Sequence, residues 1–180
     1  MGILKMSDFR QYLDSSYKFL TVAECATSDE ELEALLKASV IFSWFAIESF
    51  VNNMLDDFIQ IPPDMFPMHE RAFLLEKKFR FEDRGSDLGK FIIDNGQNEY
   101  RRLEEKIFFL IAKFSRTSNL RGETLWQEFE EFKDKRNKIA HPRRDNEITI
   151  SHSETNRYLE VAKEIINLIS VNVWKKKIDF

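Results

Sequence analysis

"LEALLKASVIFSWFAIESFVNNMLDDFI", residues 32–59, is the stretch that decides the fold of this chain. Apolar residues recur in it at positions 32, 35, 36, 40, 41, 44, 45, 47, 50, 51, 54, 55 and 58. This spacing of three and four residues predicts one long amphipathic helix with a broad buried face. The preceding "TSDEE" supplies cap residues and first-turn acids, and "IPPD" ends the helix near Gln60. Such a helix needs other helices to cover its apolar face.

The rest of the chain also favours helices. Only 5 glycines and 4 prolines occur in 180 residues, so signals for hairpins are scarce. We expect an all-α fold, an antiparallel bundle of about five main helices that forms a single domain over residues 1–180. The further helices are predicted at residues 7–26, 68–79, 88–117 (two helices with a break near Gly96), 123–140 and 151–174, with a polar connection at 80–87.

The net charge, the cysteine count and the lengths of apolar runs limit the classes of function that this chain can have. A formal net charge of -4 argues against a protein that coats nucleic acid, so any contact with nucleic acid must be local. Cys25 is the single cysteine, which excludes an internal disulfide, and we expect it in the core. No apolar run of signal-peptide length and no stretch of about 18 uncharged apolar residues occurs. We expect a soluble cytoplasmic protein without a membrane segment.

A cluster of cations surrounds one histidine in "KDKRNKIAHPRRD", residues 133–145. Arg136 falls on the apolar stripe of the predicted helix at 123–140. Because Pro142 disfavours helical geometry for the residue before it, His141 should leave the helix and turn its ring away from the axis. Arg136 and His141 can then converge on one ligand, with help from Asn137. The remaining cations of the cluster are Lys133, Lys135, Lys138, Arg143 and Arg144.

This pair of side chains is sufficient for cleavage of RNA without a metal. A histidine, whose unperturbed pKa is about 6.5, can take the proton from a 2'-hydroxyl that attacks the neighbouring phosphate. A guanidinium can bind two phosphoryl oxygens as negative charge grows on them. A plainer interpretation is that the cations complement the helix dipole and that His141 is a surface turn residue.

The segment "RNKIAH" resembles the signature of the HEPN superfamily, small helical domains in which arginine and a polar residue precede a histidine at the end of a helix. The helix "ASVIFSWFAIESFVNNML" and the segment "FLLEKKF" resemble the same family, over roughly residues 30–175. The resemblance implies a metal-independent endoribonuclease that acts as a homodimer with a shared cleft, in a toxin-antitoxin module or in antiviral defence. His141 would be the general base, Arg136 would stabilise the phosphate and Asn137 would position it. Some members of the superfamily have lost cleavage.

Further residues are assigned supporting roles. Glu48 lies within the apolar stripe of residues 32–59, and a buried carboxylate needs a partner, so we expect Glu48 to orient Arg136 with Asn52 one turn away. Alternatively, Glu48 lies at the edge of the stripe and reaches water. The cations assigned to RNA binding are Lys133, Lys138, Arg143 and Arg144, and a small basic tail follows at residues 175–177.

Competing sites are weaker. Pro63 and Asp64, followed by Glu76, Lys77 and Lys78, imitate a metal-dependent nuclease pattern, but their segment shows a helical period, so we treat the match as chance. The histidines lack metal-binding spacing and no glycine-rich phosphate loop occurs, so neither a metal nor a cofactor is expected. His152 could assist His141 across the loop. A non-cleaving RNA- or nucleotide-binding partner and a structural dimerisation module remain as alternatives, and an antitoxin protein is a further expected partner.

Overall fold

The computed structural model describes residues 7–62, 65–84, 87–115, 120–142 and 148–180. The chain forms two compact units. We call residues Lys5–Phe50 and Phe108–Phe180 the helical unit, and residues Val51–Ile107 the hairpin unit. Helices α2 and α4 pass from one unit into the other. The prediction of a single domain over the whole chain remains a prediction.

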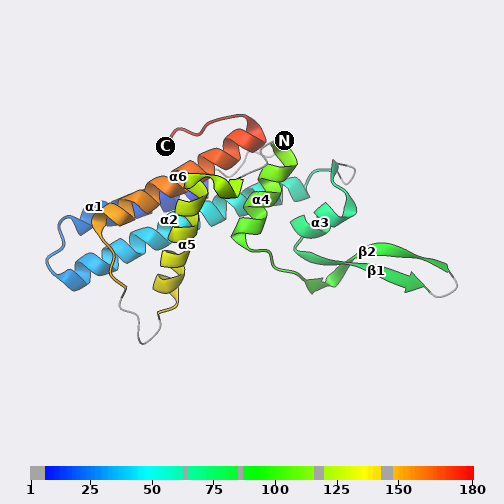
Figure 1. Ribbon diagram of the computed structural model, residues 1–180, viewed down its shortest axis with the longest axis horizontal. Helices are drawn as coiled ribbons and strands as arrows, with labels where there is room; N and C mark the ends of the chain where they lie inside the picture. The colour runs from blue at the N-terminus through cyan, green and yellow to red at the C-terminus, as the bar shows by residue number, and fades with distance from the viewer. Residues whose placement is uncertain (1–6, 63–64, 85–86, 116–119, 143–147) are drawn as a thin grey trace. The chain divides into compact units, whose positions relative to one another are not determined.

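Helices dominate the described residues, which confirms the all-α prediction (Figure 1). Their only sheet is a pair of strands. In chain order the elements are α1 (Ser7–Ala23), α2 (Asp29–Ile59), α3 (Met68–Leu74), β1 (Lys77–Arg84), β2 (Asp87–Asn98), α4 (Leu103–Phe114), the 3-10 turn η2 (Leu120–Gly122), α5 (Thr124–Ala140) and α6 (His152–Trp174).

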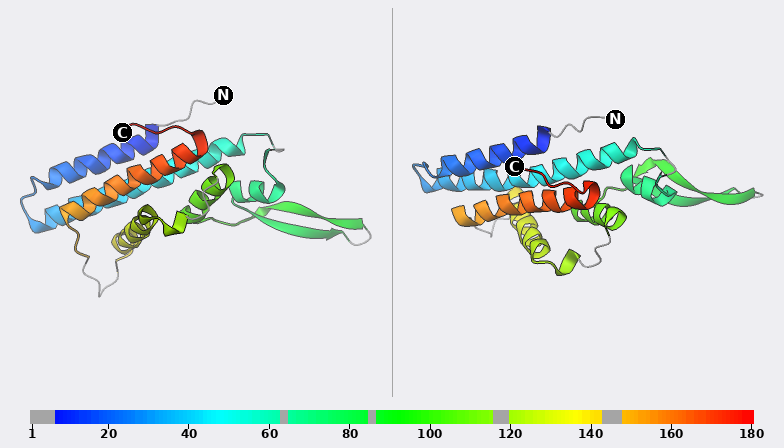
Figure 2. Two further views of the ribbon diagram at one scale, coloured as in Figure 1. Left: turned by 45° about the horizontal axis from the view of Figure 1, so that its top comes forward. Right: turned by 90° about the horizontal axis from the view of Figure 1, so that it is seen from above.

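Aromatic side chains join the helices of the helical unit. Figures 1 and 2 show α1, the first part of α2 and α6 running alongside one another, with α5 crossing them. The Trp44 ring of α2 stacks on Phe129 of α5 at 5.3 Å between centroids, with an interplanar angle of 12°. Phe132 of α5 stacks in turn on Tyr158 of α6 at 4.9 Å. Because α5 is anchored on both sides by buried rings, the end of α5 has a fixed support.

Three buried serines determine how α1 lies on α2. The Ser16 hydroxyl donates to the Ser39 carbonyl at 2.9 Å, and its oxygen lies 2.7 Å from the Ser43 hydroxyl oxygen. All three side chains are fully buried, so each needs these partners. A shift of α1 along α2 would leave buried hydroxyls without partners, which costs about 1–3 kcal/mol for each group.

The hairpin unit contains the main correction to the sequence analysis. The helix predicted at residues 68–79 ends at Leu74. Strand β1 takes up the end of that predicted helix and most of the predicted connection, and strand β2 replaces the first helix predicted after residue 88. The two strands are antiparallel. Phe79 pairs with Ile93 and Phe81 with Phe91. The apolar residues of β1 alternate with charged ones, which is the period of a strand and not of a helix.

Glu76 holds the base of this hairpin together. It stands between α3 and β1 with φ of 49°, and its carbonyl accepts a hydrogen bond from the Glu99 backbone at 2.8 Å. Its carboxylate accepts from Lys106 at 2.8 Å and from the Arg101 backbone at 3.2 Å. Burial raises the pKa of Glu76, but these hydrogen bonds outweigh it and hold the pKa below its ordinary value.

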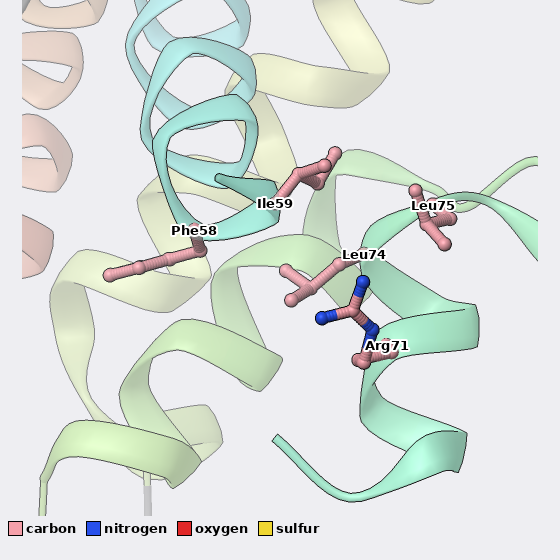
Figure 3. Close-up of a pocket in the computed structure, with 5 residues that line it drawn as sticks. All are labelled: Phe58, Ile59, Arg71, Leu74 and Leu75. Carbon is pink, nitrogen blue, oxygen red and sulfur yellow. The ribbon is translucent and has the colours of Figure 1, made fainter. Parts of the chain in front are cut away.

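An apolar hollow lies in the hairpin unit beside the end of α2. It is lined by Phe58, Ile59, Arg71, Leu74 and Leu75 (Figure 3). The hollow offers about 10 Å³ to the centre of a water molecule. Since about one water needs that much room, the hollow is too small for an organic ligand.

Helix α2 is the one helix among the described residues that is long and apolar enough to cross a membrane by length and composition. Half of its most apolar window is buried inside the fold (50%). The core helix of a soluble protein can have the same length and composition. Rings of α2 pack against Tyr12 of α1 and Phe129 of α5. Cys25, in contrast, is exposed between α1 and α2, so the prediction that it lies in the core was wrong.

Candidate active site at the end of α5

Helix α5 ends where Pro142 predicts. Ala140 is its last residue, and His141 has φ of -130° and ψ of 66°, outside helical geometry. The His141 backbone still donates to the Asn137 carbonyl at 2.9 Å, which closes the last turn. The His141 side chain is exposed. Its imidazole therefore stands at the surface, directly after a helix that is anchored in the core by Trp126, Phe129 and Phe132.

Arg136 lies one turn before His141 and is held from three sides. Its Nη2 atom is 3.5 Å from Glu48 Oε1, and its Nη1 atom donates to Asn137 Oδ1 at 3.1 Å. Its guanidinium carbon lies 5.4 Å from the centre of the Trp44 ring. The Arg136 side chain is 20% exposed and that of Glu48 is 35% exposed. Glu48 thus both contacts Arg136 and reaches solvent.

Trp44 is a residue of this site that the sequence analysis missed. Its Nε1 atom donates to Glu48 Oε1 at 2.6 Å, so one carboxylate oxygen faces both the indole and Arg136. The Trp44 ring is 3% exposed and is fixed by Phe129 and Phe132. A buried tryptophan needs an acceptor for its N–H, and an acid four residues later on a helix can provide one. The spacing of Trp44 and Glu48 was therefore a signal in the sequence.

The donors of Arg136 differ in their accessibility. Its Nε atom is buried and has no hydrogen-bond partner among the described residues. The two terminal nitrogens carry four N–H groups, of which the contacts to Glu48 and Asn137 use two. The contact to Glu48 is long, at 3.5 Å. Terminal N–H groups therefore remain for a bidentate contact with an anion, and Trp44 and Glu48 restrict the rotation of the guanidinium.

Asn52 forms a hydrogen bond within the hairpin unit. Its side-chain oxygen accepts a hydrogen bond from Lys106 at 3.0 Å, and Lys106 also pairs with Glu76. These three residues belong to the hairpin unit. A supporting role of Asn52 at Arg136 stays a prediction.

The cations assigned to RNA differ in their surroundings. Lys133 forms an ion pair with Glu130 at 2.6 Å on the same helix. Lys138 is exposed and makes no ion pair within the part of the chain that the structure describes. Arg143 and Arg144 lie outside the described residues. Lys138 is thus the assigned cation that the structure presents to solvent next to the site.

Lys135 links α5 to the start of α6. Its ammonium donates to the Thr149 carbonyl at 3.1 Å and pairs with Glu154 at 2.8 Å, and Tyr158 donates to the same carboxylate at 2.9 Å. Burial raises the pKa of Glu154, but the hydrogen bonds from Lys135 and Tyr158 outweigh it and lower the pKa. Burial, together with the Glu154 carboxylate, raises the pKa of Tyr158. The connection that follows His141 is thereby tied to α5 at Thr149.

His152 is not placed as an assistant to His141. Its Nε2 atom lies 3.3 Å from the Leu20 carbonyl and 3.5 Å from Glu24 Oε1, both at the end of α1. The ring therefore ties α6 to α1. The N-terminus of α6 is capped by Ser151, which accepts from the Glu154 backbone at 3.2 Å.

The metal-dependent nuclease pattern also gains no support, although the reason given for rejecting it was partly wrong. Lys78 lies on a strand and not on a helix. The Glu76 carboxylate, however, is occupied by Lys106 and the Arg101 backbone, and Asp64 lies outside the described residues. No group of three or more histidine, cysteine or acidic side chains within the described ranges is arranged to hold a metal ion.

A helical unit with arginine, asparagine and histidine at the end of its penultimate helix defines a HEPN-type domain. The chain belongs to the RiboL-PSP-HEPN family, whose model matches residues 7–171. The match covers α1 to most of α6 and includes the complete candidate site. No curated protein and no solved structure matches the chain significantly.

Proposed function

We propose that this protein is a metal-independent endoribonuclease, with Arg136, Asn137 and His141 as its catalytic residues. The observation that carries the proposal is the restrained guanidinium of Arg136, held by Glu48 and Trp44 one turn before an exposed imidazole. An arginine with terminal N–H groups left over beside a histidine suits the charge that develops in phosphoryl transfer. Membership of a HEPN family agrees with this chemistry.

In the proposed reaction the neutral imidazole of His141 accepts the proton of a ribose 2'-hydroxyl. The 2'-oxygen then forms a bond to the adjacent phosphorus, and the bond from phosphorus to the 5'-oxygen of the next nucleotide breaks. Arg136 neutralises the equatorial oxygens, and Asn137 limits where its guanidinium can turn. The products are a 2',3'-cyclic phosphate and a 5'-hydroxyl, and the leaving 5'-oxygen needs a proton.

We assign that proton to a second copy of the chain. His152, the other histidine of the helical unit, is bound at the end of α1 and is not assigned to this role. A two-fold axis would bring a second His141 and a second Arg136 to one cleft, and would double the local cations. A homodimer with a composite active site is therefore part of the proposal.

The cellular role is proposed from family membership alone. A cytoplasmic ribonuclease of this kind would serve as the toxin of a toxin-antitoxin module or as an effector of antiviral defence. A toxin of this type requires an antitoxin protein that blocks the cleft. The cations assigned to RNA binding are Lys133 and Lys138 of α5 and, shortly after His141 in the sequence, Arg143 and Arg144. They would attract either RNA or an acidic inhibitor.

Chemical rescue tests the role of His141. Replacement of His141 by alanine should abolish RNA cleavage while the fold is kept, because the side chain is exposed. Added imidazole should restore part of the cleavage, since it replaces the missing base. His69→Ala, which removes an exposed histidine on α3, should cleave like the wild type. Full activity of His141→Ala without imidazole would refute the assignment.

A mixed dimer tests the composite cleft. Wild-type chains are paired with Arg136→Ala/His141→Ala chains, and the hybrid is purified through two different tags. Two independent sites would leave the hybrid about half of the wild-type activity, whereas one shared site should leave far less. A clean half would contradict the shared cleft.

One observation favours a second candidate function, an RNA-binding partner that does not cleave. Within the described part of the chain, nothing orients the His141 imidazole through a hydrogen bond. A catalytic histidine normally has a partner that fixes its tautomer. If the purified protein binds RNA through Arg136 without cleaving it under any tested condition, the binding function is the correct one.

A further inference from the structure

The hairpin exposes a group of aromatic rings on one face. Cross-strand pairing puts Phe79, Phe81, Phe91 and Ile93 on the same side of the two strands, which we call the aromatic face. Phe79 and Phe91 are stacked at 5.1 Å with an interplanar angle of 12°, and Phe81 meets Phe91 at 5.3 Å and 68°. Phe81 is 53% exposed and Phe91 is 56% exposed. Two large rings thus offer much of their surface to solvent.

Gly89 gives the Phe81 ring its position. A Cβ atom at residue 89 would lie 2.3 Å and 2.6 Å from two ring carbons of Phe81. Any other residue would therefore push the ring away from β2. With glycine there, the backbone of β2 supports one side of the ring, and the opposite side is left for a ligand.

The net charge of the hairpin favours an anionic ligand. Residues 77–98 carry five cations (Lys77, Lys78, Arg80, Arg84, Lys90) and four acids (Glu82, Asp83, Asp87, Asp94), a net charge of +1 in a chain of net charge -4. Asp94 is neutralised by Arg80 at 3.0 Å. Lys78 and Lys90 are exposed and make no ion pair with any residue that the structure describes. Because each is next in sequence to a ring of the aromatic face, strand alternation places both lysines on the opposite face of the hairpin.

We propose that the aromatic face binds single-stranded RNA, with bases stacked on Phe81 and Phe91 and with the phosphates of the same strand reaching Lys78 and Lys90 around the edges of the hairpin. Flat exposed rings with nearby cations are the means by which proteins hold single strands without reading their sequence. The inference deepens the proposed function, on which it rests for the choice of RNA as the ligand. A second copy of the chain would bury the same rings but would place like-charged hairpins together. The surface thus selects unpaired RNA as substrate.

The experiment measures binding separately from cleavage. The probe is a fluorescein-labelled 2'-O-methyl RNA single strand of about ten nucleotides, which cannot be cleaved through its 2'-oxygen. Fluorescence anisotropy is compared for the single strand and for the same strand in a duplex, with the full-length wild-type chain. Tighter binding of the single strand is expected, because paired bases are unavailable for stacking.

Two matched variants separate stacking from simple burial. Phe81→Leu/Phe91→Leu keeps apolar bulk but removes the rings, and should weaken single-strand binding at least about fivefold, the low end for one lost base stack. Phe81→Trp/Phe91→Trp should bind within about twofold of the wild type, since the indole is an equally good stacking surface. Circular dichroism shows that each variant is folded. Lys78→Ala/Lys90→Ala should lower affinity and reduce the salt slope by roughly 0.7 for each lost phosphate contact.

Several results would overturn the proposal. Unchanged affinity of the leucine variant would exclude the face as an RNA surface. Equal weakening by leucine and tryptophan would exclude stacking as its basis. A leucine variant that binds RNA normally but sediments as a smaller species would assign the face to contacts between copies. Ultraviolet crosslinks of the wild type to the probe should map to residues 77–98, and crosslinks found only elsewhere would contradict the proposal. Cleavage of unmodified RNA is scored apart, so its loss affects only the proposed function.

Discussion

Glu48 and Arg136 should be energetically coupled, and the coupling can be measured by a double-mutant cycle. Glu48→Gln removes the charge while keeping an oxygen that can accept from Trp44. Arg136→Met removes the guanidinium while keeping a chain of similar length over the Trp44 ring. Because each replacement preserves packing, the cycle isolates the interaction between the two charged groups.

The magnitude follows from the geometry of the pair. Nη2 of Arg136 lies 3.5 Å from Glu48 Oε1, and the side chains are 20% and 35% exposed. Exposed ion pairs contribute about 0.2–1 kcal/mol, so partial burial predicts a coupling of about 1 kcal/mol. Glu48→Ala should cost more than Glu48→Gln, about 2 kcal/mol, because Trp44 Nε1 then loses its acceptor inside the core.

Urea unfolding followed by tryptophan fluorescence is a suitable assay. All three tryptophans, Trp44, Trp126 and Trp174, lie in the helical unit and report its unfolding. The control is the ion pair of Glu33 and Lys37 on α2, whose side chains are 45% and 31% exposed. A cycle with Glu33→Gln and Lys37→Met should give only about 0.3–0.5 kcal/mol. Additive effects of the Glu48 and Arg136 replacements would refute the idea that Glu48 orients Arg136.

The other predictions concern three residues of the site. Trp44→Phe should reduce RNA cleavage much more than Trp126→Phe, because only Trp44 donates a hydrogen bond to Glu48. Both tryptophans are 3% exposed, so the comparison controls for burial. Equal losses in a cleavage assay would show that Trp44 has no role at the site. Arg136→Lys should lose most of the cleavage rate because an ammonium lacks the bidentate geometry, and a near wild-type rate would argue against that role. Lys135→Met should be less stable than the wild type above about pH 4.5, because its ion pair with Glu154 is lost. The folded-state pKa of Glu154 is lowered from 4.5, so the ion pair stabilises the fold only while Glu154 is ionised. The difference in stability should therefore shrink as the pH falls below that value and Glu154 becomes protonated. In Glu154→Gln this pH dependence of the urea midpoint should disappear.

The helices of the helical unit could be predicted because their apolar periods are long. Residues 32–59 and 123–140 each repeat the three-and-four spacing over several turns, and both are helices within three residues of the predicted bounds. The end of α5 was equally predictable, since Pro142 acts on its neighbour through local sterics. The pairing of Glu48 with Arg136 was expected on the ground that a carboxylate in an apolar stripe needs a partner.

The hairpin was missed because its signals were read with the wrong period. Phe79 and Phe81 alternate with charged residues, but the segment follows a helical pattern that begins at Met68, and the prediction extended that helix. The chain leaves the helix at Glu76, which adopts φ of 49°. That conformation is stabilised by Lys106 and by the backbones of Glu99 and Arg101, which are more than twenty positions away in sequence. Local patterns could not reveal these contacts.

The exposed position of Cys25 has a similar cause. Its residue type is usually buried, but the turn between α1 and α2 places it outside the packed faces of both helices. The role of Trp44 required a different step, since the indole ring belongs to the core while its N–H belongs to the site. A tryptophan in an apolar stripe is recognised only as a core residue unless an acceptor for its N–H is also looked for in the sequence.

The most direct test of the account is the chemistry of the product ends. RNA is incubated with the wild-type protein and with His141→Ala in excess EDTA, and the termini are identified by mass spectrometry. The account predicts cleavage by the wild type alone, with 2',3'-cyclic phosphate and 5'-hydroxyl ends, because the 2'-oxygen is the nucleophile and no metal takes part. Loss of cleavage on chelation, or products with 5'-phosphate ends, would contradict it.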